Sequence, residues 1–96
     1  MRLDERVREK LNDIRRIAVA HGATRVRVFG SMAHGTAGPE SDLDLLIDLA
    51  PGRHLLDLVA IKQDLEDLLN RPVHVVTEAA ISPLIRDAIL LDATPL

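Results

Sequence analysis

The sequence predicts an α/β (α+β) domain in which a small mixed sheet is flanked by helices. Two long segments carry apolar residues at three- and four-residue spacing, which is typical of amphipathic helices. Three short segments are rich in aliphatic and β-branched residues, which favour strands. The two kinds of segment alternate along 96 residues, a length that suits one domain over residues 1–96.

Residues 2–21 are predicted to form the first helix, which ends at His21-Gly22 because glycine readily closes a helix C-terminus. The apolar stripe of this helix consists of Leu3, Val7, Leu11, Ile14 and Ala18. Residues 25–29 then alternate polar and apolar side chains, which predicts a half-buried strand that stops at Gly30.

Ser31 is a natural N-cap for a short helical turn over residues 32–34, and residues 35–41 are predicted to form a loop. Residues 43–49 form a second, more apolar strand, which we expect at the centre of the sheet.

Residues 55–69 predict a second amphipathic helix, because leucine, isoleucine and valine form a broad stripe along it. The proline that follows at Asn70-Arg71-Pro72 favours an end to this helix, and residues 73–76 predict a third strand. Ser82-Pro83 is expected to open a last helix that runs to about Leu91. The apolar residues of this helix exceed what a terminal helix can bury, so its face is a candidate contact for a partner.

Composition excludes several classes of function. The net charge of −3 and the single aromatic residue argue against direct nucleic-acid binding, which uses basic surfaces and stacking rings. The absence of cysteine excludes disulfides and thiolate metal sites and fits a cytoplasmic protein. No stretch has the roughly 18 consecutive apolar residues expected of a membrane span. A homo-oligomer is compatible with the sequence.

The chemistry is concentrated in residues 30–44, where Gly30-Ser31 is followed after ten residues by Asp42-Leu-Asp44. Strand side chains alternate, so Asp42 and Asp44 are expected on one face, where two carboxylates repel unless a cation lies between them. Such oxygen ligands suit Mg²⁺ or Mn²⁺. Backbone N–H groups at Gly30-Ser31 are placed to bind phosphate. Together these features predict a metal-dependent site for a nucleoside triphosphate.

On these residues the sequence resembles the minimal nucleotidyltransferase (MNT) domains of the DNA polymerase β superfamily, whose signature is Gly-Ser, ten residues and Asp-x-Asp. The resemblance extends over nearly the whole chain, including the tail that begins at Arg71. It implies a polymerase β-like nucleotidyltransferase fold. It also implies an antitoxin that transfers AMP from ATP, with Mg²⁺, to a tyrosine of a HEPN-domain ribonuclease toxin.

The resemblance assigns metal binding to Asp42 and Asp44 and phosphate binding to Gly30 and Ser31. It also expects a third carboxylate at the position of His74 and often an arginine at that of His34. Several roles for His74 are open: a ligand for Mn²⁺, a general base beside one retained metal ion, or a side chain that only packs or faces solvent. A degenerate antitoxin that neutralises its toxin by binding, and a nucleotide-binding module, are the alternatives to an enzyme.

Overall fold

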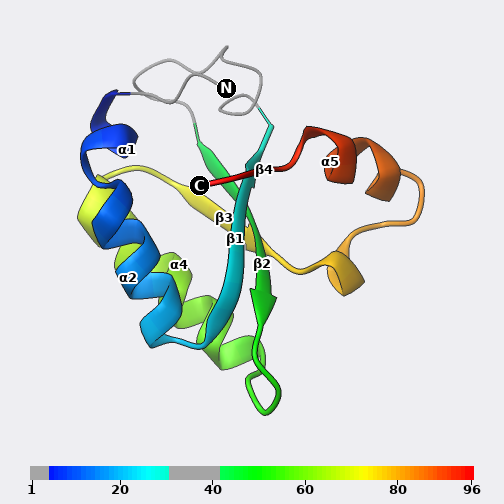
Figure 1. The fold of residues 1–96 in the computed structure, drawn as a ribbon, viewed down its shortest axis with the longest axis horizontal. Coiled ribbons are helices and arrows are strands. Elements are labelled where there is room, and N and C mark those ends of the chain that lie inside the picture. The colour runs from blue at the N-terminus through cyan, green and yellow to red at the C-terminus, as the bar shows by residue number, and fades with distance from the viewer. Residues whose placement is uncertain (1–4, 31–41) are drawn as a thin grey trace.

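A computed structural model describes residues 5–30 and 42–96 of the chain. Its centre is a four-stranded sheet in the order β3-β2-β1-β4 (Figure 1). The strands are β1 (Ala23–Phe29), β2 (Leu43–Leu49), β3 (Val73–Val76) and β4 (Thr94–Pro95). Strand β1 pairs antiparallel with β2 and with β4, whereas β2 and β3 are parallel. The predicted mixed sheet, with residues 43–49 as an inner strand, is therefore confirmed.

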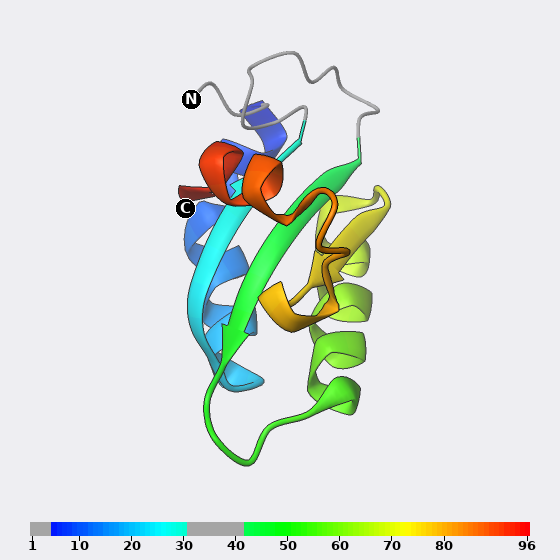
Figure 2. The same cartoon turned by 90° about the vertical axis from the view of Figure 1, so that its right-hand side faces the viewer.

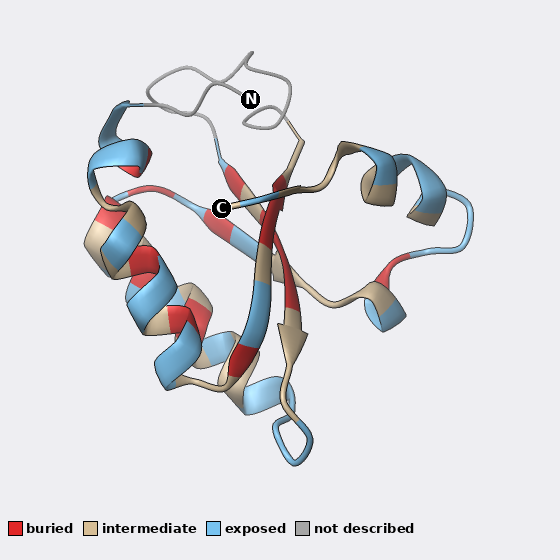
Figure 3. Cartoon of the chain, viewed as in Figure 1, coloured by how far each residue is buried: buried red, intermediate tan, exposed pale blue. Residues whose placement is uncertain are grey.

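The helices lie on both sides of this sheet (Figures 1 and 2). Helices α1 (Glu5–Glu9), α2 (Leu11–Ala20) and α4 (Leu55–Leu69) cover one face, and the 3-10 turn η1 (Glu78–Ala80) and helix α5 (Arg86–Asp92) lie toward the other. The main core fills the space between the first face and its helices, where the buried residues gather (Figure 3). Its members are Val7, Ile14, Ala18, Ala23, Val28, Leu43, Leu45, Ile47, Ile61, Leu65, Leu69 and Val73.

Several predicted boundaries match the structure. The bounds of β2, α4 and β3 are as predicted, and β1 begins two residues before the expected residue 25. Helix α2 ends with His21 as its C-cap, followed by Gly22 at φ 93°, a left-handed conformation that glycine adopts without steric cost. Helix α4 ends at Asn70, which is left-handed with φ 56°. The turn chemistry of the sequence therefore located these ends correctly.

The prediction of one continuous helix over residues 2–21 is wrong. The helix is interrupted at Lys10, whose backbone angles of φ −100° and ψ 9° leave the helical range. The Lys10 N–H donates to the Val7 carbonyl three residues earlier (3.1 Å), so α1 closes with a tight turn before α2 begins.

The prediction that Ser82 caps a last helix with Pro83 in its first turn is also wrong. The Ser82 hydroxyl accepts a hydrogen bond from the Leu84 N–H (3.4 Å). The Ser82 carbonyl accepts a hydrogen bond from the Ile85 N–H (3.1 Å), so these residues form a separate turn. Helix α5 begins only at Arg86. Elements η1 and β4 were not predicted, because segments of two or three residues are too short to show a period.

The connection through α4 places β3 parallel to β2, so both strands begin at the same end of the sheet. Strand β1 is antiparallel to β2 and therefore ends there. Among residues 5–30 and 42–96, no helix has the length and apolar character needed to cross a membrane.

Candidate active site at the end of the sheet

Four of the five predicted site residues meet at one end of the sheet. Asp44 is paired in register with Phe29 on β1 and with His74 on β3. Gly30 directly follows β1, and Asp42 directly precedes β2. The fifth residue, Ser31, lies outside the described residues, as do His34, the predicted turn over residues 32–34 and the loop over 35–41.

Gly30 is required by its backbone conformation and by its neighbour. Its φ of 72° is left-handed, which costs a residue with a side chain about 1–2 kcal/mol. A Cβ atom at this position would lie 2.4 Å from Asp44 Oδ2, well inside van der Waals contact. The absence of a side chain therefore gives the Asp44 carboxylate its room, beside the phosphate contact predicted for this backbone.

His74 reaches across the strand end to the first carboxylate of the motif. Its Nε2 atom lies 2.8 Å from Asp42 Oδ2, within hydrogen-bond distance. Both side chains are about half exposed, with 52% of His74 and 47% of Asp42 open to solvent. The imidazole at the third-ligand position thus has a carboxylate as its partner.

The surroundings of Asp44 disfavour its charged form. Burial raises the pKa of the Asp44 carboxyl; nearby His74 opposes this rise, and the negative charge of Asp42 adds to it. A cation beside both carboxylates would relieve the desolvation and the repulsion. The two carboxylates are also the hard oxygen donors that Mg²⁺ or Mn²⁺ prefers. The chemistry of this pair therefore fits a divalent cation.

The donor set on the protein is small. Across residues 5–30 and 42–96, no group of three or more histidine, cysteine or acidic side chains is arranged to hold a metal ion. Mg²⁺ is commonly held by one or two carboxylates, with water and substrate phosphates completing its shell. Asp42 and Asp44 suit that arrangement, in which the nucleotide supplies further oxygen ligands.

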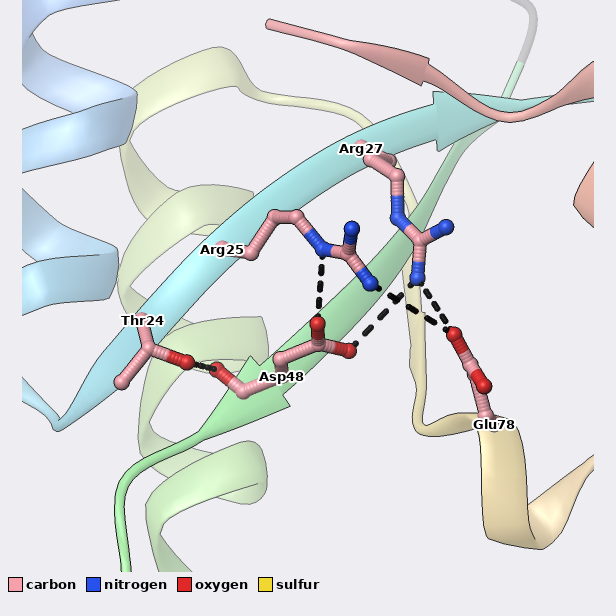
Figure 4. Close-up of polar contacts among 5 residues, drawn as sticks. All are labelled: Thr24, Arg25, Arg27, Asp48 and Glu78. Carbon is pink, nitrogen blue, oxygen red and sulfur yellow. Dashed lines mark hydrogen bonds and ion pairs between the residues drawn. The ribbon is translucent and has the colours of Figure 1, made fainter.

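Asp48 shares the strand parity of Asp44 but belongs to a different cluster (Figure 4). It lies about 13 Å further along β2, at roughly 3.3 Å per residue. Its carboxylate is 2.7 Å from Arg25 Nε and 3.6 Å from Arg27 Nη2, and Arg27 also contacts Glu78 on η1 at 2.7 Å. These arginines satisfy Asp48, which is therefore no substitute for the missing third carboxylate.

Sequence reasoning missed two residues that hold the strand carrying His74. Lys62 Nζ donates to the Val73 carbonyl (2.7 Å), and Glu66 Oε2 accepts from the Val73 N–H (3.0 Å). A lysine and a glutamate four residues apart resemble an ordinary surface pair of a helix. One feature of the sequence could have indicated their role: the apolar strand over residues 73–76 follows this lysine and glutamate after a short turn.

The fold and this site define a nucleotidyltransferase. The nucleotidyltransferase domain family matches residues 5–95, nearly the whole chain, and the chain belongs to that family. One relative, from Methanocaldococcus jannaschii, is provisionally named a protein adenylyltransferase. It is 40% identical over 87 residues, which cover 86% of this chain and 94% of the relative. The protein adenylyltransferase MntA of Thermococcus cleftensis is 31% identical over 88 residues, which cover 83% of this chain and 89% of MntA.

Solved structures agree with this assignment. A protein described provisionally as a minimal nucleotidyltransferase superposes with a TM-score of 0.84 at 44% identity, covering 100% of this chain and 97% of that one. A toxin–antitoxin structure with AMP-PNP has a TM-score of 0.74 at 20% identity, covering 88% of this chain and 69% of that one; at this identity it supports the fold alone. The predicted minimal nucleotidyltransferase fold and enzyme class are confirmed. Enzymes of this family generally use a nucleoside triphosphate and a divalent metal ion.

Proposed function

We propose that this protein is an antitoxin that transfers AMP from ATP to a tyrosine hydroxyl of a HEPN-domain toxin. The observation that carries the proposal is the convergence of Gly30, Asp42, Asp44 and His74 at one end of the sheet. The names of both relatives, protein adenylyltransferases, support the reaction. MntA, the name of one of these relatives, is also the name of a protein in a solved toxin–antitoxin structure, MntA–HpeT, and this shared name supports the kind of partner.

Asp42 and Asp44 are the proposed ligands of Mg²⁺, with Mn²⁺ as a substitute, and Gly30 and Ser31 the proposed phosphate contacts. The bound metal ion would supply positive charge against the phosphates and lower the pKa of the attacking hydroxyl. The tyrosine oxygen forms a bond to the α-phosphorus while the bond from that phosphorus to the pyrophosphate oxygen breaks. AMP is then joined to the tyrosine, and pyrophosphate leaves.

His74 is the proposed general base. If Nε2–H donates to Asp42 Oδ2, the other ring nitrogen, Nδ1, is left unprotonated and able to accept the tyrosine proton. Asp42 then fixes the ring tautomer, as carboxylates commonly do for imidazoles. The pair would thus supply a proton acceptor at the position where the resemblance expects a third carboxylate.

The test is intact mass spectrometry of the product of the adjacent gene, as the candidate toxin, after incubation with the full chain, ATP and Mg²⁺. The native protein should add one or more adenylyl groups, and Asp42→Ala should add none. Asp48→Asn is the matched control, because it removes a carboxylate charge further along the same segment of chain, on β2 and outside the site, and it should transfer like the native chain.

His74→Asp separates the remaining outcomes. Transfer by this variant and not by the native chain would show a lapsed enzyme on an intact scaffold. No transfer by any variant would contradict the proposal and favour a protein that neutralises its toxin by binding alone.

A further inference from the structure

We propose that Lys62 and Glu66 on α4 are positioning residues of the active site, because they hold the backbone of Val73 and thereby set His74 against Asp42. The inference deepens the proposed function, since its catalytic consequence rests on transfer at this site. The effect of Lys62 and Glu66 on the position of His74 can be measured without any reaction, and all these residues lie within residues 42–96.

Strand β3 lies at the edge of the sheet, with β2 as its strand neighbour. The Leu43 N–H of β2 donates to the Pro72 carbonyl (3.1 Å). Because backbone groups alternate in direction along a strand, the N–H and C=O of Val73 point away from β2. Val73 is fully buried, so leaving these two groups unpaired would cost free energy.

Side chains of α4 occupy the place that a further strand would take. Glu66 Oε2 accepts from the Val73 N–H at 3.0 Å, and Lys62 Nζ donates to the Val73 carbonyl at 2.7 Å. The same two side chains contact each other at 2.9 Å, one helical turn apart. We call this closed set of three contacts the Val73 clamp. All three contacts involve a charged group, which makes them stronger than bonds between neutral groups.

The clamp acts on the residue directly before His74. The His74 side chain is about half exposed, so little packing holds the ring, and its position depends on the backbone that carries it. That backbone belongs to a strand of four residues paired with β2. The clamp adds a second, independent attachment to α4, and it holds the backbone directly before the residue that carries the imidazole.

A purely structural role, protection of an open sheet edge, is the competing explanation. The same helix provides a matched control at its other end. There Asp57 accepts from the His54 N–H at 3.0 Å and from Arg53 at 3.2 Å, so it too is a surface acid holding a backbone N–H beside a basic partner. Loss of Asp57 should lower stability without moving β3.

The experiment compares Glu66→Ala, Glu66→Gln, Lys62→Met and Asp57→Ala in the full chain. Thermal unfolding measures stability, and proton–carbon NMR at one fixed pH records the ring signals of the four histidines, with His74 assigned from His74→Gln. Glu66→Ala and Asp57→Ala should both lower Tm. Only Glu66→Ala and Lys62→Met should shift the His74 signal, whereas Glu66→Gln, which keeps an acceptor for the Val73 N–H, should restore much of its position.

An unchanged His74 signal in Glu66→Ala and Lys62→Met, with Tm lowered as in Asp57→Ala, would overturn the proposal. If Glu66→Ala does not fold, Lys62→Met, which is a milder change, still decides the question, with Glu66→Gln as the variant that should keep the His74 signal near its native position. In a transfer assay, kcat of Glu66→Ala should fall about tenfold with KM for ATP unchanged, which is the lower end of the roughly 10–100-fold loss seen when a direct partner of a metal ligand is removed, because Glu66 acts one residue further away. If the native chain transfers no AMP, the proposed function is overturned. The Val73 clamp is then still tested by the NMR signal of His74.

Discussion

Gly30→Ala should damage the active site far more than it damages the fold. The new methyl group meets two obstacles: a left-handed backbone at φ 72°, and Asp44 Oδ2 at 2.4 Å from the new Cβ. Since ordinary van der Waals contact begins at 3.4 Å, the carboxylate oxygen must retreat by the difference, 1.0 Å. The oxygen belongs to the end of a side chain, so Asp44 gives way more easily than the backbone.

The two obstacles have separate magnitudes. The left-handed conformation should cost about 1–2 kcal/mol of unfolding free energy. For a chain of this size, each kcal/mol corresponds to a Tm shift of roughly 4–8 °C. Displacement of a reacting or ligand group by about 1 Å costs about 100-fold in rate, so kcat/KM for transfer should fall by that factor.

Gly52→Ala is the matched control, because Gly52 is also left-handed at φ 87° but a Cβ there meets nothing within 4 Å. It should lose a similar unfolding free energy in urea titration and transfer AMP like the native protein. In an Asp44→Ala background, Gly30→Ala should cost no more stability than Gly52→Ala does. Equal activity of Gly30→Ala and Gly52→Ala would refute the reasoning from the Asp44 contact.

Three further outcomes concern stability. Arg27→Met should lower the unfolding free energy by about 1–3 kcal/mol, because this arginine is buried while it contacts Asp48 and Glu78. Arg25 contacts the same two carboxylates but is half exposed, so Arg25→Met should cost less than about 1 kcal/mol; urea titration of both variants tests this difference. Asn70→Ala should destabilise by about 1 kcal/mol and Asn70→Gly should not, since only glycine and asparagine readily tolerate φ 56°; thermal unfolding measures this. Hydrogen bonds from Lys62 and the Val73 N–H lower the pKa of the Glu66 carboxyl below its ordinary value of 4.5. The ionised carboxylate therefore stabilises the fold above pH 4.5, and this stabilisation is lost as pH falls through the native pKa. Glu66→Gln should make the unfolding free energy fall less steeply below pH 4.5.

The sequence predicted two elements with an uninterrupted apolar pattern to the residue, whereas the long pattern of residues 2–21 did not reveal the break at Lys10. Strand β2 and helix α4 have this property, and the turn residues around them fixed their ends. The last helix failed because Ser82-Pro83 satisfies the pattern of a helix start, while the hydroxyl instead closes a local turn onto Leu84. A hydrogen bond between neighbours competes with helix formation, and spacing along the chain does not reveal which one prevails.

The sequence indicated which candidate residues would lie together, but not the contacts among them. The spacing of Gly30, Asp42 and Asp44 predicted their convergence. The contact of His74 with Asp42 depends on the parallel register of β2 and β3, which pairs Asp44 with His74. The Val73 clamp depends on how α4 packs along β3. Both follow from long-range geometry, which local periodicity does not encode.

The most direct test of the central claim uses ATP labelled at either the α- or the γ-phosphate. The full chain and the proposed toxin are incubated with each form and Mg²⁺, and the label on the toxin is counted. Nucleotidyl transfer predicts label from the α-phosphate only, and none with Asp42→Ala or Asp44→Ala. Label from the γ-phosphate, or α-label that persists in both variants, would contradict AMP transfer at Asp42 and Asp44.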